Sequence, residues 1–189
     1  MKKEEKMKLT TKRLILRNLK DKDLNDLVRN ANNLNVSRYL SLVPYPYTKK
    51  DGKWFIEHCK KEARKRPRKN YELGIELKEE GILIGVIGLT GIDLFVKKVT
   101  LGYWLGENYW RKGIMSEAVR KVIDFAFNKL KLNRVEVGHY KENKGSKSII
   151  VKMGFKKEGV FRKDARAKST GKFHDSHFYG LLKTEWKKS

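Results

Sequence analysis

The sequence is poor in the residues that build disulfide scaffolds and membrane spans. Its 189 residues include one cysteine, Cys59, which cannot form an internal disulfide, and this fits a reducing compartment. The longest apolar run, residues 81–90, has the length of a strand and falls short of the about 20 residues that a membrane helix needs. Residues 1–6 are charged and no apolar stretch follows them, so we expect no secretory signal, no membrane partner and a cytoplasmic location.

Acidic residues are few relative to basic ones. The chain has 45 Lys and Arg against 22 Asp and Glu, so its formal net charge is +23. A field of this sign attracts anions, and the charge alone does not choose among nucleic acid, an anionic cofactor, an acidic partner and a membrane surface. The densest basic run, residues 60–69, has two interpretations. It is either a solvated face or an electrostatic contact to RNA or the ribosome, which would weaken steeply with salt.

The remaining composition is that of a folded protein. Hydrophobic residues make up 39% of the chain and aromatic residues 11%, which excludes an intrinsically disordered chain. No linker rich in Pro, Gly or Ser divides the sequence. We therefore expect a flexible basic extension at residues 1–8 and a single domain at residues 9–189.

Hydrophobic periodicity predicts an alternation of strands and helices. The expected order is a strand at 13–18, helices at 21–32 and 48–66, strands at 71–78, 82–90 and 99–105, a helix at 113–130, a strand at 134–140, a helix at 146–153, and strands at 155–161 and 174–182. The second helix is expected to direct Trp54, Phe55 and Cys59 toward the core. Consecutive strands favour antiparallel pairing, and strand–helix–strand units favour parallel neighbours. The order predicts an α/β (α+β) fold: a mixed, mostly antiparallel twisted sheet of about seven strands with helices on both faces.

One strand–loop–helix segment, residues 101–118, carries the strongest chemical signal. The first amides of a helix have no internal partner and lie at the positive end of the helix dipole, so they form a natural anion site. Gly113 lets an anion approach the backbone, and Arg111 and Lys112 add positive charge. This pattern indicates a pyrophosphate site, although neither GxxxxGK[ST] nor GxGxxG occurs in the chain. The alternative is a tight-turn glycine beside a solvated basic pair.

Three groups of residues, in this order, resemble the GNAT acetyltransferases, and most closely their ribosomal-protein N-terminal acetyltransferase branch. They are GYWLG at 102–106 with YWRKGIMSEA at 109–118, NKGS at 143–146, and KMGF at 152–155. The ending DSHFYGLL at 175–182 is similar to that branch too, and the likeness extends from about residue 9 to residue 186. Trp110 departs from the usual Gln or Arg, and Met115 from the usual small residue.

The resemblance implies acetyl-CoA as co-substrate and no metal. In this family the strand before the loop diverges from its neighbour, and pantetheine would pair there with the backbone of Trp104, Leu105 and Gly106. The pyrophosphate would bind the amides of Arg111, Lys112, Gly113, Ile114, Met115 and Ser116. Asn143 would anchor the pantetheine or acetyl arm. Ser146 would contact the cofactor and act catalytically by protonating the leaving thiolate; its alternative role is only that of a helix N-cap.

The resemblance further implies transfer of an acetyl group to a primary amine, such as the N-terminal α-amine of a ribosomal protein. With a pKa of about 8, an α-amine needs less help from a base than a lysine at about 10.4. Glu136, His139 and Asp164 are candidate bases, and none of them is preferred.

Two other functions remain open: acetylation of a small-molecule amine, and a non-catalytic basic module that binds nucleic acid or the ribosome. The net charge argues against cationic polyamines as acceptors. His174 and His177 alternate with Asp175 along one strand, which places the carboxylate on the opposite face and argues against a metal cluster. A monomer and a homodimer are both compatible with the sequence.

Overall fold

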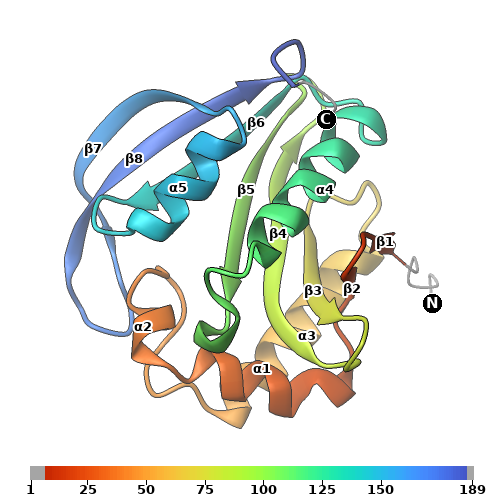
Figure 1. Cartoon of the computed structure of the whole chain (residues 1–189), viewed down its shortest axis with the longest axis vertical. Helices are drawn as coiled ribbons and strands as arrows, with labels where there is room; N and C mark the ends of the chain where they lie inside the picture. The colour runs from red at the N-terminus through yellow and green to blue at the C-terminus, as the bar shows by residue number, and fades with distance from the viewer. Residues whose placement is uncertain (1–6, 187–189) are drawn as a thin grey trace.

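The computed structural model describes residues 7–186 (Figure 1). Its elements are, in chain order, β1 (Lys8–Thr10), β2 (Leu14–Asn18), the 3-10 turn η1 (Asp21–Asp23), α1 (Leu24–Ala31), α2 (Leu34–Ser37), α3 (Lys49–Arg64), β3 (Tyr71–Leu77), β4 (Leu83–Asp93), β5 (Lys98–Leu105), the 3-10 turn η2 (Glu107–Tyr109), α4 (Ile114–Asn128), β6 (Arg134–Tyr140), α5 (Lys144–Lys152), β7 (Lys156–Arg166) and β8 (Phe173–Leu182). Between residues 7 and 186, no helix has the combined length and apolar character needed to cross a bilayer.

The described strands form one eight-stranded sheet in the order β1-β2-β3-β4-β5-β6-β8-β7. All neighbouring strands are antiparallel except β5 and β6, which are parallel and are connected through α4. Helices α4 and α5 cover one face, and α1 and α3 cover the other (Figure 1). The predicted mixed, mostly antiparallel sheet with helices on both faces is therefore confirmed.

The additional strand is β1, which sequence patterns did not predict. Leu9 pairs with Leu16 of β2, and Met7 is only 9% exposed and belongs to the main core. Most of the predicted extension, residues 1–6, lies outside the described residues. Its last two residues, Met7 and Lys8, belong to the folded part.

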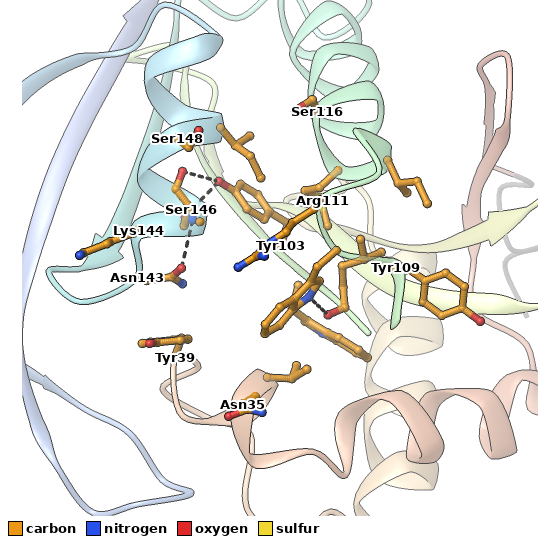
Figure 2. Close-up of a pocket in the computed structure, with 18 of the residues that line it drawn as sticks. Asn35, Tyr39, Tyr103, Tyr109, Arg111, Ser116, Asn143, Lys144, Ser146 and Ser148 are labelled. Atoms are coloured by element: carbon orange, nitrogen blue, oxygen red, sulfur yellow. Dashed lines mark hydrogen bonds between the residues drawn. The ribbon is translucent and has the colours of Figure 1, made fainter. Parts of the chain in front are cut away.

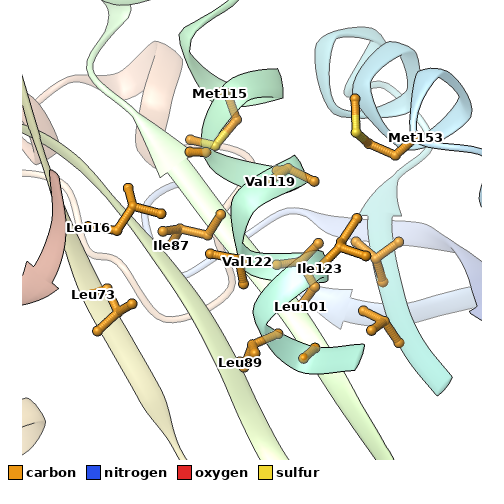
Figure 3. Packing of buried hydrophobic residues seen from close by; sticks show 14 of the residues in the cluster. Leu16, Leu73, Ile87, Leu89, Leu101, Met115, Val119, Val122, Ile123 and Met153 are labelled. Carbon is orange, nitrogen blue, oxygen red and sulfur yellow. The ribbon is translucent and has the colours of Figure 1, made fainter. Parts of the chain in front are cut away.

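Helix α4 is held rigidly by its apolar face. The buried residues Ile114, Met115, Ala118, Val119, Val122, Ile123, Ala126 and Phe127 recur at helical spacing. They pack against sheet residues such as Ile87, Leu89 and Leu101 (Figure 3). This packing fixes the start of α4 relative to β5, and the functional site depends on that relation.

Helix α3 starts at the predicted capping box. The Asp51 amide donates to Thr48 Oγ1 at 3.3 Å, and the Thr48 amide donates to Asp51 Oδ2 at 2.9 Å. On the face of the sheet covered by α1 and α3, a second hydrophobic cluster includes Leu27, Ile56 and Cys59, and Phe55 packs against that cluster. The prediction for Trp54 was wrong, because its side chain is 67% exposed. Trp54 is about 200° around the helix from the buried Ile56, so it lies outside the core-facing stripe.

A buried ion-pair network joins the start of α1 to the sheet. The Arg17 guanidinium donates to both Asp23 carboxylate oxygens, at 2.7 and 2.8 Å, and to Glu76 Oε2 at 2.7 Å. The side chains of Arg17 and Asp23 are only 8% and 3% exposed. The hydrogen bonding of the Arg17 guanidinium to the Asp23 carboxylate is the main cause that raises the pKa of Arg17. Both side chains are shielded from solvent, so removal of either one would leave the charge of the other buried without its main partner.

Candidate active site

The parallel strands β5 and β6 separate partway along their length. Their last paired residues are Leu101 and Val137. Beyond this point β5 stays paired with β4 as far as Leu105, and β6 stays paired with β8 as far as Tyr140. The C-terminal ends of the two strands therefore form a wedge, the divergence that the family resemblance implied.

A cleft of about 610 Å³ opens at this wedge and extends to the start of α4 (Figure 2). Its volume lies in the range of about 300–1,000 Å³ that is usual for small-molecule sites. The walls come from β5, the turn before α4, the start of α5, and α2 with the residues that follow it. The predicted cofactor-binding residues that line it are Trp104, Leu105, Arg111, Gly113, Ile114, Met115, Ser116, Asn143 and Ser146.

The backbone of β5 presents alternate residues to the wedge. The Gly106 amide donates to Ile84 O of β4 at 2.8 Å, so it faces away from β6. Because backbone groups alternate along an antiparallel strand, Trp104 also pairs toward β4, while Tyr103 and Leu105 point their amides toward the wedge. Of the three residues predicted to pair with pantetheine, only Leu105 has this orientation.

Gly106 serves a different purpose. A Cβ added there would lie 2.1 Å from Asn30 Oδ1, so the glycine permits close packing against α1. Trp110, which departs from the family pattern, donates its indole N–H to Leu105 O at 2.7 Å. This bond closes the loop between β5 and α4, and it occupies the Leu105 carbonyl as a hydrogen-bond acceptor.

The turn into α4 has free amides. Gly113 adopts φ 71° as the N-cap of α4, and Arg111 has φ 59°, so two left-handed residues shape the turn. The first intrahelical bond runs from the Glu117 amide to Gly113 O, and no side chain caps the helix. Successive amides in such a conformation create an anion-binding concavity. The Met115 side chain is 5% exposed and points into the core, so it leaves the amides open (Figure 3).

Lys112 does not line the cleft. Its ammonium lies 5.9 Å from the centre of the Tyr109 ring, and its carbonyl accepts a bond from Arg13 Nη1 at 2.9 Å. Arg13 also donates its Nε to Glu117 Oε2 at 2.7 Å. Lys112 therefore helps to tie the turn to the start of β2, and Arg111 is the cation of this basic pair that faces the cleft.

The start of α5 supplies the polar groups opposite β5. Asn143 is the N-cap, and its Oδ1 accepts the Ser146 amide at 3.0 Å, so the interpretation of Ser146 as the cap was wrong. The Ser146 hydroxyl is instead 3.0 Å from the Tyr103 hydroxyl across the wedge (Figure 2). Burial raises the pKa of Tyr103 to about 12, which keeps its proton in place at neutral pH. The structure thus adds Tyr103 to the site.

None of the three candidate bases lines the cleft. Glu136 contacts Lys98 and Arg134 at the closed end of the wedge. His139 is 5% exposed and bonds Tyr140 O at 2.7 Å, while Asp164 lies on the exposed strand β7. Periodicity identifies a strand residue, but it does not identify which end of the strand carries the site.

Glu142 is the only carboxylate that lines the cleft in the described part of the chain. Its Oε2 lies 3.1 Å from His174 Nδ1, and the ring of His174 stacks on Tyr140 at 4.4 Å. A hydrogen bond from its own backbone amide and then the bond to His174 lower the pKa of Glu142. The only sequence feature that points to Glu142 is its position directly before Asn143, a predicted cofactor-binding residue. No local pattern identifies its contact with His174.

Comparison with known proteins agrees with this geometry. A family model described as an acetyltransferase (GNAT) domain matches residues 13–156. The uncharacterized N-acetyltransferase p20 of Bacillus licheniformis is 33% identical over 180 residues, which cover 94% of this chain and 97% of that protein. The ribosomal-protein-serine acetyltransferase of Escherichia coli (strain K12) is 31% identical over 84 residues, 44% of this chain and 47% of that protein.

A solved structure extends the comparison to three dimensions. The microcin C7 self immunity acetyltransferase MccE, solved in complex with acetyl-CoA and AMP, matches with a TM-score of 0.79 at 24% identity. The match covers 91% of this chain and 93% of that one, and at this identity it shows the fold alone. Because the family match spans the divergent strands, the glycine turn and α5, and p20 is similar along nearly the whole chain, this protein belongs to the GNAT family and is an acetyltransferase.

Proposed function

We propose that the chain transfers the acetyl group of acetyl-CoA to a primary amine, and that the N-terminal α-amine of a protein is the acceptor. The observation that carries the proposal is the row of free amides at the start of α4, which opens onto the cleft between the divergent strands. Amides and helix dipole together favour a diphosphate. Arg111 adds a positive charge on the cleft wall.

The residues of the cleft suit the pyrophosphate and the pantetheine parts of a bound coenzyme. The pyrophosphate would accept bonds from the amides between Gly113 and Ser116. Pantetheine would follow the wedge beside the amides of Tyr103 and Leu105, as an additional strand partner. Asn143 uses Oδ1 to cap α5, which leaves its Nδ2 group to contact a pantetheine carbonyl.

The chain's own groups support the chemistry of transfer. The coenzyme supplies an activated thioester carbonyl, and a free Leu105 amide in the wedge would stabilise negative charge on its oxygen, an interaction worth roughly 3 kcal/mol. As the new C–N bond forms and the C–S bond breaks, the amine loses one proton and the sulfur gains one. The paired hydroxyls of Ser146 and Tyr103 would donate to the sulfur.

Glu142 would accept the proton of the amine, directly or through water. It is the carboxylate on the cleft wall, and its lowered pKa keeps it ionised at neutral pH. His174 would hold the carboxylate in place through Nδ1. General-base help of this kind is worth about 10²–10⁴-fold, and an α-amine with a pKa of about 8 needs less of it than a lysine does.

The choice of a protein N-terminus rests on the relatives. One similar protein is named for acetylating a serine of ribosomal proteins, and the net charge of +23 disfavours small polycationic acceptors. The cleft is also lined by Val36 of α2 and by Tyr39 and Leu40, which follow that helix, and together they form a wall suited to the first side chains of a peptide.

Two measurements test the proposal in order. Acetyl-CoA at about 100 times its dissociation constant should add about 2.7 kcal/mol of stability and raise the melting temperature. Mass spectrometry of ribosomal proteins incubated with enzyme and acetyl-CoA should then show a gain of one acetyl group at an N-terminus. No thermal shift at millimolar acetyl-CoA would refute coenzyme binding, and acetylation of internal lysines alone would refute the acceptor.

A further inference from the structure

The basic run at residues 60–69 does not form a continuous charged surface. Lys60 contacts two carboxylates, at 2.6 and 2.9 Å, and Lys65 is paired with Glu62. Arg68 is only 8% exposed, and its guanidinium lies over a tyrosine ring. Much of the charge that the sequence concentrates here is therefore engaged within the protein.

The outer face of α3 carries exposed cations, two of which come from this basic run. They are Lys49, Lys50, Lys53, Lys61 and Arg64. At 100° per residue these five positions fall within an arc of about 120°, along about 22 Å of helix. Within residues 7–186 none of the five forms an ion pair with a carboxylate. Glu57 lies in the same arc, and its carboxylate contacts Lys60 and none of the five. The charge of the five cations is therefore directed to solvent from a single side of the molecule.

Trp54 lies at the edge of this strip of cations. Its side chain is 67% exposed, and its indole stacks on the His58 ring, with centroids 5.3 Å apart and planes 11° apart. His58 Nε2 lies 3.4 Å from Glu72 Oε2, which holds the ring from the sheet side. A large aromatic ring is thus fixed in orientation while most of it remains in water. Packing in the core accounts for the apolar residues on the inner face of α3, but it does not account for Trp54.

We propose that the outer face of α3 binds a single-stranded polynucleotide. A base would stack on the exposed indole of Trp54, and neighbouring phosphates would contact Lys50, Lys53, Lys61 and Arg64. An oriented aromatic ring beside unpaired cations is the combination that sequence-tolerant single-strand binding uses. An acidic peptide would neutralise the cations but would leave the indole without a planar partner.

The binding test uses the whole protein and a fluorescein-labelled oligouridylate of about 12 nucleotides. Fluorescence anisotropy over a salt series should give a slope of log K against log salt of about −3, since four phosphate contacts contribute about 0.7 each. Trp54→Ala should weaken binding about fivefold or more at constant salt and leave the slope unchanged. The Lys50→Glu/Lys61→Glu double variant should roughly halve the slope.

A matched control separates this surface from the general charge of the protein. Lys157→Glu/Lys172→Glu makes the same change in net charge on the β7–β8 hairpin and should bind nearly as the wild type does. The same measurement with an oligothymidylate of equal length shows whether the protein prefers RNA or DNA. Binding of either oligomer that depends on the α3 residues supports the proposal.

Three results would overturn it: no binding at low salt, wild-type affinity in Trp54→Ala, or equal losses in the two double variants. Circular dichroism melting checks that each variant is folded. Acetyl-CoA binding should be unchanged in every variant, because neither α3 nor the two lysines of the control variant line the cleft.

Discussion

The glycine turn before α4 allows a sharp test of the coenzyme site, by comparing Gly113→Asp with Gly113→Asn. Gly113 has φ 71°, and a Cβ added there would meet only Arg13 Nη2, at an ordinary 3.7 Å. Space therefore does not forbid either side chain. Asn and Asp have the same shape and tolerate the left-handed region better than other residues, so the two variants differ essentially in one charge.

The expected magnitudes follow from this geometry. The left-handed conformation costs about 1–2 kcal/mol in either variant, which corresponds to a fall in melting temperature of roughly 2–8 °C for a chain of this size. A carboxylate about 4 Å from a phosphate charge adds a repulsion of about 1 kcal/mol at the dielectric constant of water and about 4 kcal/mol at an effective constant of 20. Acetyl-CoA affinity should therefore fall about 5-fold to 10³-fold further in Gly113→Asp than in Gly113→Asn.

Isothermal titration calorimetry with acetyl-CoA, at low and at high salt, measures this difference directly. The gap between the two variants should narrow as salt screens the added charge. Both variants should melt at similar temperatures without ligand, which shows that the comparison reports binding and not folding. Equal acetyl-CoA affinity in the Asn and Asp variants would refute the placement of the pyrophosphate at this turn.

The other predictions concern the hydroxyl pair, the buried ion pair and a buried histidine. Ser146→Ala and Tyr103→Phe should each lower kcat more than they raise KM; steady-state kinetics that show only a raised KM would contradict the proposed donation to sulfur. Asp23→Asn should destabilise the protein by about 3 kcal/mol in urea unfolding because it leaves Arg17 buried without its main partner, and a loss below 1 kcal/mol would be inconsistent with that. Burial lowers the pKa of His139, so its neutral form stabilises the fold above pH about 6.5, and this contribution is lost as the pH falls below that value. Thermal melts from pH 7 to 5 should therefore fall less steeply in His139→Phe than in the wild type.

Local sequence determined the elements and the glycine turn before α4. The apolar spacing of α4, the Thr48–Asp51 capping box and the glycine at the end of the loop each involve residues within a few positions of one another. Helix periodicity, capping and turn conformation are near-neighbour effects, so they can be predicted from the sequence by itself. The order of the motifs was enough to suggest the family, which the comparisons confirm.

Tertiary structure decided which side chains meet. Tyr103 and Ser146 are 43 residues apart, and Glu142 and His174 are 32 apart, so no local pattern links either pair. Sequence periodicity identifies the side of a helix or strand that faces the core, because it depends on the element alone. The partner across a cleft depends on where two distant strands diverge, and that is set by the packing of the whole sheet.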